Sequence, residues 1–179
     1  VDVKVDGGIT PLIISAYAGY VDVVEILLQA GADPNIVNDD NESPLMTSAL
    51  SEEANEIVPM LLEAGAEIDL RDRFGRTAFI VQAQLGRLGA VQRLLEAGTE
   101  LEAKDVDGQT AAFAAAMNGH TEVLEFLIEQ GALIEVQNNF NATPLTLAAF
   151  GGYKETVRLL LGKGADPYAR GNENRTAVE

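Results

Sequence analysis

The segment Asp105-Val106-Asp107-Gly108-Gln109-Thr110 carries alternating acids and a turn glycine, as the start of a calcium-binding loop does. Calcium needs about six to eight oxygen ligands, usually including one distant bidentate Glu. The same register recurs as Asp72-Arg73-Phe74-Gly75-Arg76-Thr77, in which two arginines stand among the positions that ligands would occupy. The spacing therefore favours a structural turn, and a calcium- or small-ligand-binding module is kept as an alternative.

A single histidine, His120, limits the catalytic chemistry open to this chain. The chain has no cysteine, so a Cys nucleophile is absent, and a Ser-His arrangement would have to use His120. Zinc sites usually combine several His or Cys ligands. The carboxylate pairs Asp39-Asp40 and Glu52-Glu53 lie on expected loops, with no apolar pocket around them to support acid–base work. We therefore expect no enzymatic activity, no cofactor and no metal site.

Three Asn-x-Ser/Thr sequons could accept N-linked sugars in a secreted protein. Each Asn stands two residues before a Ser or Thr, at a position where other segments of the chain have glycine. Gly and Asn enter the left-handed backbone conformation at low cost, so turn geometry explains these sequons. The asparagines are Asn41, Asn141 and Asn174, and the matching glycines are Gly8, Gly75 and Gly108.

A Ser or Thr followed by Pro or Ala, and then by a short helix of small and apolar residues, recurs along the whole chain. The hydroxyl can accept hydrogen bonds from the first free amides of a helix, and Pro suits the first helical position. Successive copies are separated by 33, 34, 33, 33 and 33 positions, and a fixed period of this length indicates a repeat architecture. The capping residues are Thr10, Ser43, Thr77, Thr110, Thr143 and Thr176.

Each complete repeat contains a second stretch whose apolar side chains have the spacing of one helical face. In the first repeat these are Val23, Val24, Leu27 and Leu28, and Gly31 follows as a helix stop. The later repeats carry close variants of the same stripe and the same glycine. A single helix pair cannot bury this stripe alone, so the pairs must stack on their neighbours.

These features resemble ankyrin repeats: a Thr-Pro-Leu start, a Gly119-His120 break between the helices, and a Leu-Leu-x-x-Gly-Ala end as at Gly31-Ala32 and Gly65-Ala66. The resemblance implies a curved all-α solenoid of five stacked helix pairs with β-hairpin extensions, partial repeats at both ends and a single domain over residues 1–179. It also implies a protein-binding scaffold whose hairpin tips and first helices form a concave face. The expected units are residues 5–37, 38–71, 72–104, 105–137 and 138–170, with the partial start of a sixth at 171–179.

The second and third repeats depart from this pattern. The second has one extra residue, lacks the glycine between its helices, and places Pro59 within its second helix, where an interior Pro costs about 3 kcal/mol. We expect a longer connecting loop there and a helix that starts late. The third repeat has Gln82 where small apolar residues usually pack, and we expect this amide to find a local hydrogen-bond partner.

The residues expected on the concave face include aromatic, Met and Arg side chains, which are the types enriched in interface cores. We expect Arg73 and Arg76 to pair with acids of a partner, and Asp39, Asp40 and Glu42 to pair with bases. Phe113 could instead pack between repeats, because the neighbouring alanines are too small to fill the space. The candidates are Tyr17, Asp39, Asp40, Glu42, Leu50, Arg73, Phe74, Arg76, Phe113, Met117, Phe140 and Phe150.

The formal charge of −16, from 28 acids and 12 bases, argues against nucleic acid and anionic membrane surfaces. It favours a basic protein partner slightly, although an acidic surface also keeps a stack soluble. The sequence contains no run of about 18 apolar residues that could span a membrane. Because the chain starts at Val1 rather than Met, export stays open, while a cytoplasmic, monomeric protein is favoured. The expected function is recognition of another protein, and an inhibitor or immunity-type protein that blocks an enzyme is the alternative.

Overall fold

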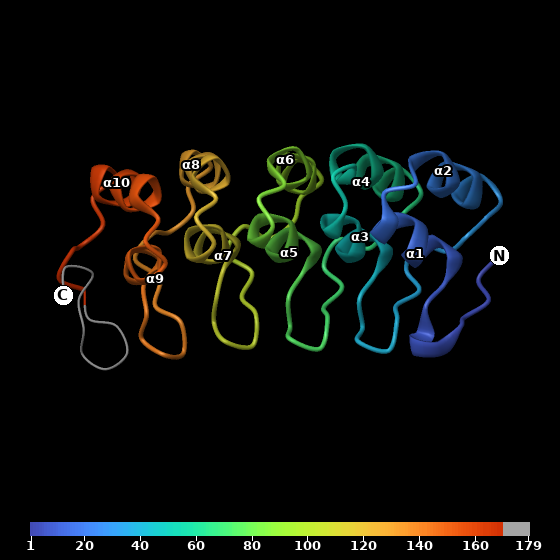
Figure 1. Ribbon diagram of the computed structural model, residues 1–179, viewed down its shortest axis with the longest axis horizontal. Helices are drawn as coiled ribbons and strands as arrows, with labels where there is room; N and C mark the ends of the chain where they lie inside the picture. Colours follow the sequence, from blue (N-terminus) through green and yellow to red (C-terminus); the bar gives the residue numbers. More distant parts are fainter. Residues whose placement is uncertain (170–179) are drawn as a thin grey trace. The chain divides into compact units, whose positions relative to one another are not determined.

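The computed structural model describes residues 1–169, and in that part the chain forms ten α-helices, two short 3₁₀ helices and no β-strand (Figure 1). The helices follow one another in pairs, so the expected all-α repeat architecture is confirmed. They are α1 (Pro11–Ala18), α2 (Val21–Gln29), α3 (Pro44–Thr47), α4 (Ala54–Glu63), α5 (Ala78–Gln84), α6 (Leu88–Glu96), α7 (Ala111–Met117), α8 (Thr121–Glu129), α9 (Pro144–Phe150) and α10 (Lys154–Gly162), with η1 (Asp6–Gly8) and η2 (Ser48–Leu50).

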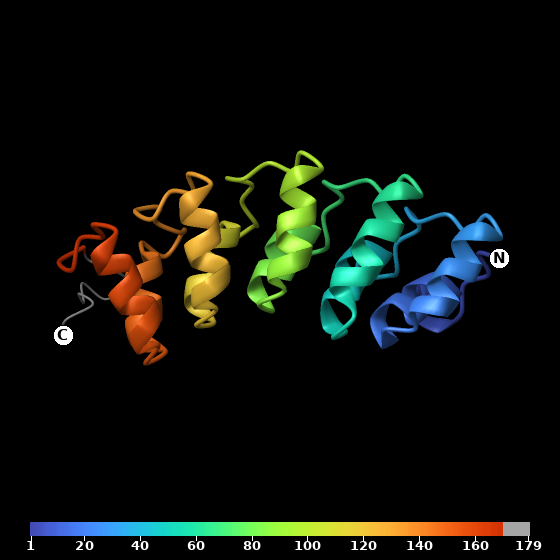
Figure 2. The same ribbon diagram turned by 90° about the horizontal axis from the view of Figure 1, so that it is seen from above.

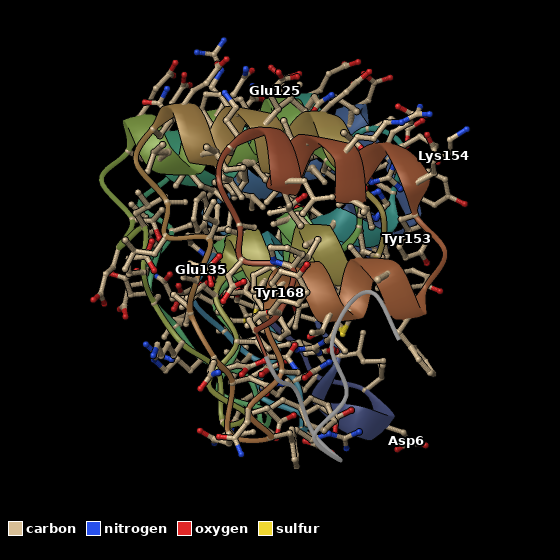
Figure 3. All side chains as sticks on the ribbon, turned by 90° about the vertical axis from the view of Figure 1, so that its left-hand side faces the viewer. Asp6, Glu125, Glu135, Tyr153, Lys154 and Tyr168 are labelled. Carbon is tan, nitrogen blue, oxygen red and sulfur yellow. The ribbon has the colours of Figure 1, made fainter. Side chains whose placement is uncertain are left out.

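The chain divides into two compact units. The first contains Val1–Gln82 and Arg87–Glu100, and the second contains Ala83–Gly86 and the described residues from Leu101 onward. In the first unit, the second helices α2, α4 and α6 pack side by side above α1 and α3 (Figures 1 and 2). In the second unit, α8 and α10 lie above α7 and α9, and Glu125 and Lys154 project outward from them (Figure 3). The single domain expected over residues 1–179 stays a prediction.

Each first helix begins at the expected hydroxyl cap. The Ile13 amide donates to Thr10 Oγ1 at 3.2 Å, and the Thr146 amide donates to Thr143 Oγ1 at 3.2 Å. Ser43, Thr77 and Thr110 accept equivalent bonds. A hydroxyl cap of this kind stabilises a helix by about 0.5–2 kcal/mol relative to alanine. Five of the six expected caps are thus confirmed, and Thr176 lies outside the described residues.

The apolar stripes of the second helices form much of the core of both units, although in α2 only Val24 is buried and Val23 of the expected stripe is 43% exposed. In α4, Ile57, Val58 and Leu61 are fully buried, and Leu124 and Leu127 of α8 are buried in the same way. Burying a large aliphatic side chain contributes about 1.5–3 kcal/mol, so these stripes supply much of the cohesion of each unit. The expected stacking of second helices is confirmed within each unit by the packing of α2 on α4, α4 on α6, and α8 on α10.

The turns between repeats are closed by side chains instead of β-hairpins. Asp72 Oδ1 accepts from the amides of Phe74 at 2.9 Å and Arg76 at 2.8 Å. Two backbone bonds also cross the turn, from the Asp72 amide to the Arg76 carbonyl and from the Gly75 amide to the Asp72 carbonyl. Asn38, Asp105 and Asn138 close their turns in the same way. The expected hairpin strands are not formed because these side chains take the amides that a ladder would need. In residues 1–169 the bridging is limited to one isolated Val5–Ile9 pair.

The left-handed residues of these turns are those that the sequence predicts. Asn41 and Asn141 have φ of 61° and 57°, and Gly75 and Gly108 have φ of 72° and 78°. No other non-glycine residue in the described part has positive φ. The interpretation of the first two sequons as turn positions is therefore confirmed, and Asn174 lies outside the described residues.

The second repeat differs from its expectation. Helix α4 begins at Ala54, eleven residues after its cap Ser43, which is the same offset as from Thr10 to α2. Pro59 lies inside α4, and the three-residue connection at 51–53 matches those of later repeats. The expected long loop and late helix start were therefore wrong. Without a left-handed glycine to reverse the chain, the first helix tightens into η2 instead, and the extra residue lengthens the start of α4.

Gln82 is fully buried in the first unit. Its Nε2 donates to Ser48 Oγ at 3.1 Å and to the Leu45 carbonyl at 3.3 Å, so the amide nitrogen has the partners expected for it. Both partners belong to the preceding repeat rather than to the same one. The Oε1 atom has no hydrogen-bond partner among the described residues. An unpaired buried oxygen is costly, so the Oε1 atom of Gln82 lowers the stability of the fold.

Candidate partner-binding surfaces

The seventh residue after each cap lies on the exposed side of the first helix. In the first unit these residues are Tyr17, which is 54% exposed, and Leu50, which is 51% exposed. The residues just before them, Ala16 and Ala49, are fully buried, so each helix turns a small side chain inward and a large one outward. Because α1 packs against η2, we define this pair as the Tyr17–Leu50 surface.

The second unit has an equivalent surface. Phe150, the last residue of α9, is 88% exposed, and Met117, the last residue of α7, is half-buried. Helices α7 and α9 pack together, so we define this pair as the Met117–Phe150 surface. Phe140, at the tip of the preceding turn, is 49% exposed. Large apolar side chains with this exposure are the usual anchors of protein interfaces.

Phe113 does not contribute to any surface. Its side chain is fully buried in α7, together with Ala112, Ala115 and Ala116. Its proposed contact with a partner is therefore corrected, and the alternative expectation of packing in the interior is confirmed. The ring fills the space that the small neighbouring side chains leave open.

Arg73 and Arg76 pair with acids of this chain. Arg76 Nε donates to Asp72 Oδ2 at 2.7 Å, and Arg73 Nη1 lies 2.5 Å from Asp40 Oδ1. Both guanidinium groups lie over the Phe74 ring, at 4.7 and 5.0 Å from its centroid, as cation–π contacts do. The expectation that they pair with acids of a partner stays a prediction, and both guanidinium groups already have a carboxylate partner within the first unit. Phe74 itself remains 45% exposed.

The three acidic candidates of the turn at residues 38–42 differ in their surroundings. Asp40 pairs with Arg73, and Glu42 Oε2 accepts from Asn38 Nδ2 at 2.9 Å. Asp39 is exposed, and its amide donates to the Gly7 carbonyl of the preceding turn at 2.9 Å. Of the three, Asp39 therefore presents its carboxylate most openly.

His120 has a structural position in the second unit. Its Nε2 lies 2.9 Å from the carbonyl oxygen of Gln84, the last residue of α5. In the first unit Arg87, at the equivalent position, donates from Nε to the Ala49 carbonyl at 3.0 Å. At the next equivalent position, the Tyr153 ring lies against Gly119 (Figure 3). The residue before each second helix thus covers the end of the preceding first helix.

The remaining chemical candidates take part in turns. Asp105 Oδ1 accepts from the amides of Asp107 and Gln109, which is the role of Asp72 in the turn before it. Within residues 1–169, no group of three or more His, Cys, Asp or Glu side chains is placed to hold a metal ion. No helix in the same part of the chain combines the length and the apolar character needed to cross a membrane.

A second set of polar residues was not predicted to be functional but joins successive repeats. Asn35 Oδ1 accepts from the Glu67 amide at 2.7 Å, and Glu102 Oε1 accepts from the Leu133 amide at 2.9 Å. Asp2 and Glu135 accept equivalent bonds from the Asp33 and Asp166 amides, and Asp69 Oδ1 accepts from the Thr99 hydroxyl at 3.3 Å. All five residues stand eight positions before a capping residue, and this shared offset was the signal by which they could have been found. We refer to them as the inter-repeat clasps.

Three known proteins match the chain over about half of its length or less. It is 37% identical to E3 ubiquitin-protein ligase KEG of Arabidopsis thaliana over 81 residues, 45% of this chain and 5% of that protein. It is 40% identical to Ankyrin repeat and KH domain-containing protein mask-1 of Caenorhabditis elegans over 88 residues, 48% of this chain and 3% of that protein. With human Transient receptor potential cation channel subfamily A member 1 the identity is 33% over 88 residues, 36% of this chain and 8% of that protein.

These matches cover only small parts of much longer proteins. A family model described as ankyrin repeats, in three copies, matches residues 1–72 and 79–171, which is most of the chain. Most of the helices, hydroxyl caps and left-handed turn residues described above lie in the matched residues, and Gly75 and Thr77 fall between the two matched ranges. The chain therefore belongs to the ankyrin-repeat family.

Proposed function

We propose that this chain is a non-catalytic recognition module that binds a partner protein through its turns and first helices, the face expected to be concave. Ankyrin repeats are in general non-enzymatic protein–protein interaction modules. The observation that carries the proposal is the exposure of Tyr17, Leu50 and Phe150 at one register position, with Ala16 and Ala49 buried directly before the first two. Apolar surface left in water costs about 25 cal/mol per Å², and a partner that covers it removes that cost.

The proposed partner is a basic protein. The chain carries 28 acids against 12 bases, and charge complementarity favours association with cationic surfaces. Arg73 and Arg76 support the same choice, because their charges are compensated by Asp40 and Asp72. An inhibitor that blocks an enzyme would use the same surfaces, and it differs in that one tightly bound partner would lose activity. The alternative of a calcium-binding module has no support beyond the sequence spacing, since Asp105 closes a turn.

Affinity capture with matched variants tests this function. The bait variants are Tyr17→Ala/Leu50→Ala for the first unit and Phe150→Ala for the second. The control is Ile26→Ala, which also removes an exposed apolar side chain but lies on second helix α2. We expect the control to recover the same partners as the natural chain, and at least one surface variant to lose them. Equal recovery by all four folded baits would show that these surfaces do not bind the partner.

A further inference from the structure

We propose that the Tyr17–Leu50 surface of the first unit receives a partner segment in which Lys or Arg side chains flank apolar ones. This inference rests on the proposed function and specifies the chemistry of the segment for one of its surfaces. The apolar component follows from Tyr17 and Leu50 themselves, which are half-exposed and lie on the packed elements α1 and η2. An apolar anchor that covers both side chains would remove them from water together.

The acidic component follows from the groups at either end of these first helices. The Glu53 carboxylate lies against Gly19, two residues after Tyr17, and Glu53 itself stands three residues after Leu50. At the opposite end, where the chain enters the first helices from the turns, Asp39 is exposed. Carboxylates therefore flank the apolar pair on both sides along the helix direction. Cationic side chains on either side of an apolar anchor would complement this arrangement.

The bases of the first unit do not offset this acidity for a partner. The unit holds 17 of the 28 acids and 6 of the 12 bases. Arg73, Arg76, Arg87 and Arg93 form ion pairs within the chain, with Asp40, Asp72, Glu52 and Glu96 respectively. Lys4 and Arg71 donate to the Val37 and Gly75 carbonyls. Every base of this unit thus has an internal partner, and the charge left for an incoming segment is negative.

The second unit gives the contrast that makes the inference specific. Its turn at residues 137–141 reads Gln-Asn-Asn-Phe-Asn and carries no charge beside the exposed Phe140. The second unit holds 11 acids in all, fewer than the first. We therefore assign the preference for cationic segments to the Tyr17–Leu50 surface and not to the Met117–Phe150 surface.

A selection from a random library of displayed 12-residue peptides tests this inference on the full chain. We expect enrichment of peptides that combine Lys or Arg with Leu or aromatic residues. Chemically synthesised winners are then titrated by fluorescence anisotropy against two surface variants, Tyr17→Ala/Leu50→Ala and Asp39→Asn/Glu53→Gln. The matched control is Glu56→Gln/Glu63→Gln, which also removes two exposed charges but does so on second helix α4.

We expect Tyr17→Ala/Leu50→Ala to weaken binding about tenfold or more, as loss of anchor residues does. Asp39→Asn/Glu53→Gln should weaken it about three- to tenfold at low salt and less at high salt, because salt screens exposed charges. The control should bind within about twofold of the natural chain. Equal weakening by the control would identify diffuse charge attraction and overturn the inference.

The remaining outcomes separate this inference from the proposed function. Enriched peptides that are acidic or uncharged, but depend on Tyr17 and Leu50, overturn the cationic preference and leave the function standing. Peptides that bind both surface variants as tightly as the natural chain overturn the surface itself. A selection without enrichment over an unrelated bait overturns the inference as stated, while capture of a partner through Phe150 would still support the function.

Discussion

The Nε2 atom of His120 lies 2.9 Å from the carbonyl oxygen of Gln84, which belongs to the preceding repeat. The carbonyls of the last turn of a helix have no partner within that helix, and a hydrogen-bond donor from the next repeat satisfies one of them. The only histidine of the chain therefore has a stabilising role.

We expect His120→Ala to lower the free energy of unfolding by about 1–2 kcal/mol, because the Gln84 carbonyl loses its donor and the ring contact is lost. Urea unfolding followed by circular dichroism measures the change. Glu122→Ala, at an exposed position of α8 two residues further along, is the control. Its free energy of unfolding should stay within about 0.5 kcal/mol of that of the natural chain. A His120→Ala chain as stable as the control would contradict the structural role of this histidine.

Substitution at Asp72 separates turn closure from ion pairing. Asp72→Ala removes the acceptor for two amides and leaves Arg76 without its carboxylate, so we expect a loss of about 3 kcal/mol. Asp72→Asn keeps the amide acceptor, as Asn38 and Asn138 do in other turns, and should cost about 1 kcal/mol. Thermal and urea unfolding of both variants provide the comparison. Equal losses would show that the ion pair, and not turn closure, stabilises this segment.

Gln82→Leu should leave stability unchanged or raise it by about 1 kcal/mol, because it replaces a buried amide with an unpaired oxygen by an apolar side chain of similar volume. Ser48 Oγ keeps a partner, since it also donates to the Leu45 carbonyl. Gln82→Ala is the contrast, and the cavity it leaves should destabilise the fold by about 2 kcal/mol or more. Chemical denaturation of the three chains tests the order. If Gln82→Leu is the least stable, the Gln82 amide contributes more to stability than its hydrogen bonds to Ser48 and Leu45 suggest.

Substitution of Phe113 should lower stability strongly, whereas substitution of Phe150 should hardly change it. Phe113→Ala removes a fully buried ring and should cost about 3–5 kcal/mol of stability. Phe150→Ala removes a ring that is mostly in water and should change stability by less than about 0.5 kcal/mol. Differential scanning calorimetry of the two single variants measures both effects. A large loss for Phe150→Ala would mean that its ring is held by the fold and is not available to a partner.

The period of the chain and its local signals were sufficient to predict most of the fold. Thr10 and Thr143 cap helices, and Asn141 is left-handed, because these effects act within a few residues of sequence. The prediction at Pro59 failed because the missing glycine is compensated by η2, a tertiary adjustment that local propensity does not report. The hairpin strands failed for a similar reason, since Asp72 and Asn38 take the amides of the turns with their side chains.

Candidate site residues were less predictable than the fold. The register placed Tyr17, Leu50 and Phe150 on exposed positions, because one helical face is enough to decide that. The register did not predict the ion-pair partner of Arg73, because a long side chain can reach several neighbours. That partner, Asp40, is 33 positions away. For Phe113 the helical register favoured the surface, and the small size of the neighbouring alanines correctly indicated burial.

The inter-repeat clasps constrain how such a chain can change its length. Asn35 and Glu102 each accept a hydrogen bond from a residue about one period further along, so the acceptor and donor of every clasp are supplied by different modules. Deletion of part of a module would shift all later donors away from their acceptors, whereas removal of a whole period restores each pairing. Growth and shortening by complete modules is therefore the mode of divergence that this architecture tolerates best.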